Sequence, residues 1–239
     1  MVIGAVSFGG QMEPHVSERE GVIQYQLAFI DGPPEPASGL PELIAWRKIL
    51  RLVGMLGQDP DRYAGLGFGN LSLRLEGGKQ QSGQPRFAIS GSQTGHLADV
   101  GPEHFATVTG WDVEDNRVEA RGPTRPSSET MTHAVIYEAD DDVRCVMHVH
   151  SPEIWRGARR LGIPITPEAA TYGTPEMARE VQRLARERPG NAERILAMGG
   201  HEDGMIAFGG SADEAGLTLV KAVVASFQLE VKQGAGRPT

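Results

Sequence analysis

Two histidines separated by one residue, His148 and His150, are the side chains best suited by type and spacing to do chemistry. They end a mostly apolar run, residues 143–150, and alternate residues of an extended strand project to one face of a sheet. Val146 and Val149 indicate an interior strand, where an imidazole must be hydrogen-bonded or coordinated. The pair predicts half of a metal site, with two hydrogen-bonded core histidines as the alternative.

Two further residues could complete a catalytic centre. His201 lies between two strand-like runs, residues 194–198 and 205–208, so the chain could return a third imidazole to the same sheet edge. Three histidines and one open coordination position are typical of a catalytic metal site. Glu129 begins a helix-like segment, where it could act as a general base beside the metal or could be the acidic residue favoured in a first helical turn.

Three segments rich in hydrogen-bond donors predict an anionic small-molecule substrate. Residues 65–72 contain three glycines but precede a strand, which argues against the dinucleotide-binding glycine motif and a nicotinamide cofactor. Residues 90–95 form a second such turn, and both could instead be tight turns that need positive φ. Ser127 and Ser128 stand at a helix start, where backbone amides attract phosphate or carboxylate.

The elements that must position these residues alternate between helix and strand. Apolar periodicity and capping residues predict helices that open at Pro41, Ser127 or Ser128, Pro152, Thr174 and Ser211. Strand-like runs cover residues 71–75, 87–89, 106–113, 117–120, 143–150, 194–198 and 205–208. The summed pattern predicts the α/β class, as a three-layer α/β/α sandwich with a central, mainly antiparallel sheet.

Composition divides the chain into three regions. Residues 1–40 mix glycine, proline and charge, so we expect an irregular N-terminal extension. Residues 41–231 are predicted to form one globular domain, because a chain of this length can bury a full core. Residues 232–239 are predicted to be a flexible tail.

Charge and cysteine content limit the partners and the location. The 239 residues carry 31 acidic and 23 basic side chains, a formal charge of -8, so no basic surface is expected for nucleic acid or an anionic membrane. No apolar stretch is long enough to span a bilayer. Cys145 is the one cysteine, which excludes an intramolecular disulfide, and we expect a cytoplasmic protein.

A series of short motifs in a fixed order resembles the class II aldolase/adducin superfamily, in the form typified by L-fuculose-1-phosphate aldolase. The motifs are Gly69-Asn70-Leu71-Ser72, Thr94-Gly95, Pro126-Ser127-Ser128-Glu129, His148-Val149-His150, Tyr172-Gly173-Thr174 and His201. The resemblance covers roughly residues 41–231. It implies a nine-stranded, mainly antiparallel sheet flanked by helices, and a homotetramer with its sites at subunit interfaces.

The resemblance also implies residue roles. A divalent metal, usually zinc, with manganese, iron and cobalt as alternatives, would be bound by His148, His150 and His201. Glu129 would be the acid/base. Phosphate would be contacted by Asn70, Thr94, Gly95, Ser127 and Ser128. Such a centre stabilises an enediolate formed when a proton leaves or a carbon–carbon bond breaks.

Two departures from the motif pattern bear on the reaction. Ala169 stands where the fuculose-phosphate aldolases carry a tyrosine acid, and the turn after His201 is two residues longer than usual. Within that turn, Glu202 or Asp203 could assist the metal ligands or act as an alternative acid, but two acids in a turn are more often solvated.

The sequence therefore predicts a metal-dependent carbon–carbon lyase of the aldolase type, acting on a sugar phosphate or sugar-acid derivative. A dehydratase, decarboxylase or epimerase of the same superfamily is the alternative, because fold membership does not choose among these reactions. A non-catalytic, adducin-like scaffold is disfavoured, because such domains lose the three metal histidines that this chain retains.

Overall fold

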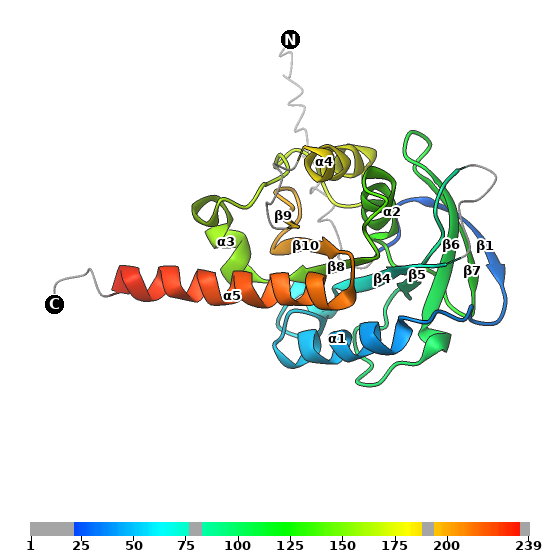
Figure 1. Cartoon of the computed structure of the whole chain (residues 1–239), viewed down its shortest axis with the longest axis horizontal. Helices are drawn as coiled ribbons and strands as arrows, with labels where there is room; N and C mark the ends of the chain where they lie inside the picture. Colours follow the sequence, from blue (N-terminus) through cyan, green and yellow to red (C-terminus); the bar gives the residue numbers. More distant parts are fainter. Residues whose placement is uncertain (1–21, 77–82, 188–193, 235–239) are drawn as a thin grey trace, which may run out of the picture.

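The computed structural model describes residues 22–76, 83–187 and 194–234 (Figure 1). An eight-stranded sheet runs through its centre in the order β1-β7-β6-β5-β4-β8-β10-β9, and β2 and β3 form a separate pair. The strands are β1 (Gln26–Asp31), β2 (Gly57–Gln58), β3 (Gly67–Phe68), β4 (Asn70–Arg74), β5 (Phe87–Ser90), β6 (Phe105–Asp112), β7 (Arg117–Gly122), β8 (Cys145–His150), β9 (Ile195–Ala197) and β10 (Gly204–Gly209). The α-helices are α1 (Leu40–Leu52), α2 (Thr130–Ala139), α3 (Pro152–Leu161), α4 (Pro175–Arg186) and α5 (Ala212–Gly234).

The helices cover both faces of the sheet. Buried side chains of α2 and α4 share one apolar cluster with the sheet, and those of α1, α3 and α5 share the other. Figure 1 shows α2 and α4 above the central strands, and α1 and α5 below them. Neighbouring strands of the eight-stranded sheet pair antiparallel, except for the parallel pair β1 and β7. The predicted α/β/α sandwich with a mainly antiparallel sheet is confirmed. The described residues contain eight of the nine strands that the family resemblance implies for this sheet.

Alternation along β8 decides which face carries the histidines. Val146 packs in the cluster under α2 and α4, whereas Met147 and Val149 pack in the cluster under α1, α3 and α5. Since successive side chains of a strand point to opposite faces, His148 and His150 project to the same side as Val146. The face that α2 and α4 cover is therefore the one that holds the imidazoles.

Helix starts follow the capping chemistry of the sequence. The Ser151 hydroxyl accepts a hydrogen bond from the Ile154 amide at 3.4 Å at the start of α3, and the Thr174 hydroxyl accepts one from Met177 at 3.2 Å at the start of α4. Proline occupies the first turn of both helices, where its missing amide hydrogen costs nothing. The cap of α3 fixes the chain directly after His150.

The prediction of an irregular extension over residues 1–40 is wrong for residues 26–31, which form β1. This strand adds to the edge of the sheet beside β7, and Leu27 and Phe29 pack against the core. The three prolines within residues 33–36 follow the strand directly, and they disfavour regular structure only from that point onward. Residues 1–21 lie outside the described part of the chain.

The predicted flexible tail also begins too early. Helix α5 continues to Gly234, three residues into the region 232–239, and residues 235–239 lie outside the described part. Although α5 is 23 residues long, no helix among the described residues is apolar enough along its length to cross a bilayer.

Candidate metal centre

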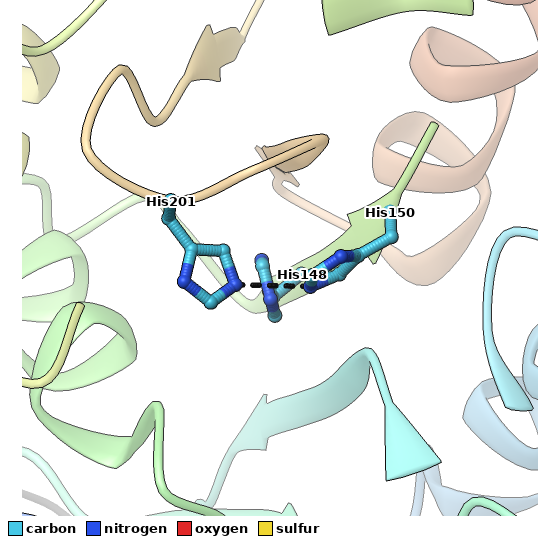
Figure 2. A group of neighbouring side chains, drawn as sticks. All are labelled: His148, His150 and His201. Atoms are coloured by element: carbon cyan, nitrogen blue, oxygen red, sulfur yellow. Dashed lines mark hydrogen bonds between the residues drawn. The ribbon is translucent and has the colours of Figure 1, made fainter. Parts of the chain in front are cut away.

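Three histidines from two segments meet at one end of β8 and β10 (Figure 2). His148 and His150 are the fourth and last residues of β8, and His201 lies in the turn between β9 and β10. The antiparallel pairing sets Gly204, the first residue of β10, opposite His150, so the turn stands beside the end of β8. All three imidazoles are buried.

The ring nitrogens are close enough to share one ion. One nitrogen from each of the three rings lies within 4.8 Å of the others, and Nε2 of His150 and Nε2 of His201 are 3.0 Å apart. The ring centroid of His148 is 5.0 Å from that of His150 and 5.2 Å from that of His201. Figure 2 shows the rings converging from opposite sides, with the dashed line joining His150 and His201.

The chemistry of this donor set fits a divalent metal. The carbonyl oxygen of Met205 lies 3.2 Å from Nδ1 of His148 and can only accept a hydrogen, which selects the tautomer whose Nε2 carries a lone pair. Backbone carbonyls commonly orient metal-binding histidines in this way. Three imidazoles that converge in a buried site suit zinc and its neighbours in the transition series.

Glu129 occupies the N-cap position of α2, and its side chain does not cap the helix. It is buried, with 2% of its surface exposed, and the Thr132 hydroxyl donates to its Oε2 at 2.5 Å. An acidic residue that served only the helix dipole would lie at the surface, where the charge is hydrated at no cost. The buried carboxylate therefore has a different use, at the end of a helix that covers the histidine-bearing face of the sheet.

The five residues predicted to contact phosphate lie around one small pocket. Its lining includes Asn70, Ser92, Thr94, Gly95, Ser127 and Ser128. Within the described chain, the buried Asn70 Oδ1, a hydrogen-bond acceptor, has no hydrogen-bond partner. Gly95 is required by close approach, because a Cβ there would lie 2.3 Å from the carbonyl oxygen of Gly57.

The pocket and the histidines share one edge of the sheet. Asn70, the first residue of β4, pairs directly with His148 of β8. The loop before α2 is joined to the end of β5 by a hydrogen bond from the Ser127 amide to the Ser90 carbonyl, at 3.2 Å. An anion in the pocket would therefore lie beside the three histidines, on the side of Glu129.

Tyr63, which the sequence did not single out, lies against His150 and is hydrogen-bonded to Asp203 in the His201 turn. The Tyr63 ring meets the His150 ring edge-on at 4.5 Å, and the Tyr63 hydroxyl donates to Asp203 Oδ2 at 2.8 Å. Burial raises the pKa of Tyr63, and neighbouring Asp203 adds to that rise, so the phenol stays protonated. The prediction that Glu202 and Asp203 are solvated is confirmed for Glu202, which is exposed, and is wrong for Asp203, which is buried.

The segment that precedes β1 is joined to residues of the site by hydrogen bonds. The Tyr25 hydroxyl donates to the Ser127 carbonyl at 2.8 Å, and burial raises the pKa of this phenol. Tyr172 stacks on His201 at 4.8 Å and donates its hydroxyl hydrogen to the Val22 carbonyl at 2.8 Å. Of these two tyrosines, Tyr172 alone stood in a sequence motif. Partners of Tyr25 lie more than 100 residues away, and no local pattern reveals such contacts.

Comparison with known proteins places the chain in one family. The family described as Class II Aldolase and Adducin N-terminal domain matches residues 59–229, which is most of the chain. Two curated relatives are methylthioribulose-1-phosphate dehydratases. The one from Gluconacetobacter diazotrophicus is 41% identical over 85 residues, 35% of this chain and 34% of the relative. The one from Leptospira interrogans is 37% identical over 89 residues, 36% of this chain and 32% of the relative.

These matched stretches span about a third of the length of either relative. Among solved structures, an L-fuculose 1-phosphate aldolase superposes with a TM-score of 0.60 at 21% identity, over 87% of this chain and 92% of that one. The structural likeness at this identity establishes the fold.

Proposed function

The chain belongs to the class II aldolase and adducin family, and from that membership we propose that it is a divalent-metal-dependent lyase acting on a small phosphorylated hydroxycarbonyl compound. The main observation behind the proposal is that the histidine cluster and the donor-lined pocket lie next to each other. Three buried histidines and a donor-lined pocket adjoin at the register pair of Asn70 and His148. A substrate with a carbonyl at one end and a phosphate at the other would occupy both.

The metal ligands in this proposal are His148, His150 and His201, and zinc is the first choice of metal, before manganese, iron and cobalt. Bound there, the cation would polarise a substrate carbonyl and stabilise negative charge on its oxygen. The protein contributes the orientation of the rings, through the Met205 carbonyl on His148 and the stacking of Tyr172 on His201.

Glu129 is the proposed general base. Its carboxylate is shielded from bulk water, at the start of the helix that covers the histidine-bearing face of the sheet. The hydrogen bond from Thr132 holds Oε2, which limits the positions that the carboxylate can take. Removal of the proton on the carbon beside the carbonyl is the step that a base at this place can perform.

The substrate phosphate is assigned to Asn70, Thr94, Gly95, Ser127 and Ser128. The donors of the described pocket lining are neutral hydroxyls, an amide and backbone N–H groups, several of them at the start of α2. Such groups bind a dianion by hydrogen bonds and by the partial positive charge of a helix N-terminus.

Two reactions pass through the same enediolate, and the local similarity favours dehydration. In dehydration the base removes the proton on that carbon and the hydroxyl group on the next carbon leaves, whereas in aldol cleavage a base removes the proton of that hydroxyl group and the bond between the two carbons breaks. The two curated relatives are dehydratases, whereas the aldolase comparison extends only to the fold. Ala169 is exposed and has no acidic hydrogen to supply, so the tyrosine acid of the fuculose-type aldol step has no counterpart at this position. Aldol cleavage is the second candidate, because it uses the same metal and base.

The assembly and location belong to the same proposal. We assign a homotetramer, supported by a stripe of exposed apolar residues on α5, Leu217, Val220, Val224, Phe227 and Val231. A cytoplasmic location is supported by Cys145, a buried free thiol that does not call for an oxidising compartment.

Solvent exchange tests the proposed chemistry. Zinc-loaded protein is incubated with ketose 1-phosphates in deuterated water, and the products are analysed by mass spectrometry. For dehydration we expect exchange of the proton beside the carbonyl and a product lighter by one water. For aldol cleavage we expect two carbonyl fragments, one of which takes up solvent deuterium on the carbon beside its carbonyl group.

The Glu129→Gln variant is the matched control for that experiment. It is expected to keep its metal and to lose exchange and turnover by a factor of about 10²–10⁴, the usual contribution of a general base. Exchange at the wild-type rate in Glu129→Gln would refute the assignment of Glu129.

A further inference from the structure

Residues in the left-handed backbone region gather beside the histidines. Tyr63, Ala64 and Asp203 have φ of 49°, 55° and 60°, and they are three of the five non-glycine residues with positive φ in the described chain. A non-glycine residue in this region is strained relative to ordinary backbone, so surrounding contacts must hold it in place.

Those contacts join two segments that are far apart in the sequence. The Tyr63 hydroxyl donates to Asp203 Oδ2 at 2.8 Å and accepts a hydrogen bond from Arg62 Nη2 at 2.9 Å. Arg62 is itself anchored, because its Nη1 donates to the Gly54 carbonyl at 2.8 Å and its guanidinium lies over the Phe68 ring at 4.5 Å. The loop that holds Tyr63 is thereby tied to the turn that holds Asp203.

The same pair touches two of the three imidazole-bearing positions. Asp203 follows His201 by two residues in the turn, and its carbonyl accepts a hydrogen bond from the Ser151 amide at 2.9 Å, directly after His150. The Tyr63 ring packs edge-on against His150, with 4.5 Å between centroids and 67° between planes. Tyr63 and Asp203 therefore join the end of β8 to the His201 turn.

We propose that the hydrogen bond between Tyr63 and Asp203 is a lock that sets His150 and His201 at the spacing a metal ion needs. This inference rests on the proposed metal centre. Tyr63 and Asp203 are positioning residues, because they act through the ligands and not on the substrate. Groups that orient metal ligands typically contribute 10- to 100-fold to metal affinity.

The test measures the Zn²⁺ affinity of the full chain by competition with a chromophoric chelator. Tyr63→Phe removes the hydroxyl and keeps the ring on His150. Asp203→Gly removes the carboxylate and suits a left-handed position, so it adds no backbone strain. Each is expected to weaken the Zn²⁺ Kd about 10- to 100-fold. The double variant should bind Zn²⁺ as tightly as the single variant of lower affinity, because both substitutions remove the same hydrogen bond.

Two matched variants separate the lock from a general loss of stability. Asp203→Asn keeps an oxygen that accepts the phenol hydrogen and tolerates positive φ, so it should bind Zn²⁺ nearly as the wild type does. Tyr137→Phe removes another buried hydroxyl, 2.8 Å from Ser72 Oγ and away from the ligands, and should leave the Zn²⁺ Kd unchanged. The visible spectrum of the Co²⁺-loaded protein should change in Tyr63→Phe and not in Tyr137→Phe.

The outcomes are distinguishable. A wild-type chain that binds no Zn²⁺ would overturn the proposed function and the lock together. A wild type that binds Zn²⁺, with unchanged Kd in Tyr63→Phe and Asp203→Gly, would overturn the lock alone. If Tyr63→Phe does not fold, the Zn²⁺ affinities of Asp203→Gly and Asp203→Asn test the proposal instead. Equal affinities of these two variants would reject the lock.

Discussion

His133 is a buried histidine whose surroundings differ from those of the three clustered imidazoles. Its Nδ1 lies 2.7 Å from the Ser72 hydroxyl, which is also 2.8 Å from the Tyr137 hydroxyl, and its side chain is fully buried in α2. Burial lowers the pKa of His133 to about 3, because the imidazolium has no compensating charge there. His133 is therefore a neutral core residue in the native protein.

This lowered pKa makes stability depend on pH. In the unfolded chain a histidine has a pKa of about 6.5, so between the two values the unfolded state binds the extra proton. The contribution of neutral His133 to the free energy of unfolding is fully present above about pH 6.5, the pKa of a histidine in the unfolded chain. Below that pH it falls by up to about 1.4 kcal/mol per pH unit. Denaturant titrations in EDTA should show a shallower pH dependence for His133→Gln than for wild type between about pH 6 and pH 4.

His96 provides the control for that prediction. It is exposed, so His96→Gln should follow the wild-type pH profile. Equal slopes for wild type and His133→Gln would contradict the assignment of His133 as a buried neutral group.

At the scale of residues, local pattern predicted what lies within one strand or one turn. The spacing of His148 and His150 determined their common face, because alternation is a property of any strand. Their meeting with His201 could be expected, but neither segment alone requires it, since it depends on the pairing of β8 with β10. Tyr63 and Asp203 are 140 residues apart, and turn composition misassigned Asp203 because solvation of a turn depends on what packs over it.

At the scale of elements, α1 holds the loop that lines the proposed phosphate pocket, which we call the anion pocket. Arg47 on this helix is 1% exposed, and its two terminal nitrogens donate to the carbonyls of Leu97 at 3.0 Å and Thr94 at 2.7 Å. Arg51, one turn later, donates to the Gly95 carbonyl at 2.8 Å. With these carbonyls turned towards α1, the loop keeps its shape around the pocket.

Arg47→Lys should weaken substrate binding more than it slows the reaction. A lysine presents a single ammonium and cannot hold both carbonyls with the fixed geometry of a guanidinium. The KM of a phosphorylated substrate and the inhibition constant of inorganic phosphate are each expected to rise about tenfold, which corresponds to about 1.4 kcal/mol, with kcat nearly unchanged.

The neighbouring Lys48 gives a control. Its ion pair with Asp99, at 2.7 Å, is exposed and contributes little, so Lys48→Met should leave KM unchanged. A lowered kcat with unchanged KM in Arg47→Lys would show that α1 does not act through the anion pocket.

Element types were more predictable than element limits. The helices and the long strands follow from apolar periodicity and caps, because each signal is contained within the element. β1 was missed, since its pairing with β7 satisfies backbone groups that no local pattern accounts for. The two-residue strands β2 and β3 carry no period at all, so sequence could not separate them from turns.

At the scale of the whole molecule, the surface around α5 exposes more apolar side chains than is typical of a monomeric protein. On α5, Val224 is 50% and Phe227 is 47% exposed, and Val53, directly after α1, lines the same hollow as these two residues and is 58% exposed. Extended exposed apolar surface marks contact with another protein surface. The family resemblance suggested a homotetramer, and this stripe is where we expect subunits to meet.

Val224→Glu should therefore dissociate the assembly. A charge placed in an apolar contact loses its hydration without gaining a partner. Sedimentation velocity should give a tetramer for wild type and a smaller species for Val224→Glu. Lys232→Glu changes a charge on the same helix outside the stripe and should remain tetrameric. A monomeric wild type would contradict the proposed assembly.

Metal content tests the central claim most directly. Protein purified without chelator is analysed by plasma mass spectrometry, together with His201→Gln and, as a buried histidine outside the cluster, His133→Gln. Wild type and His133→Gln are expected to carry about one divalent metal per chain, and His201→Gln much less. A wild type without metal, or equal metal content in His201→Gln, would contradict the assignment of His148, His150 and His201 as a metal centre.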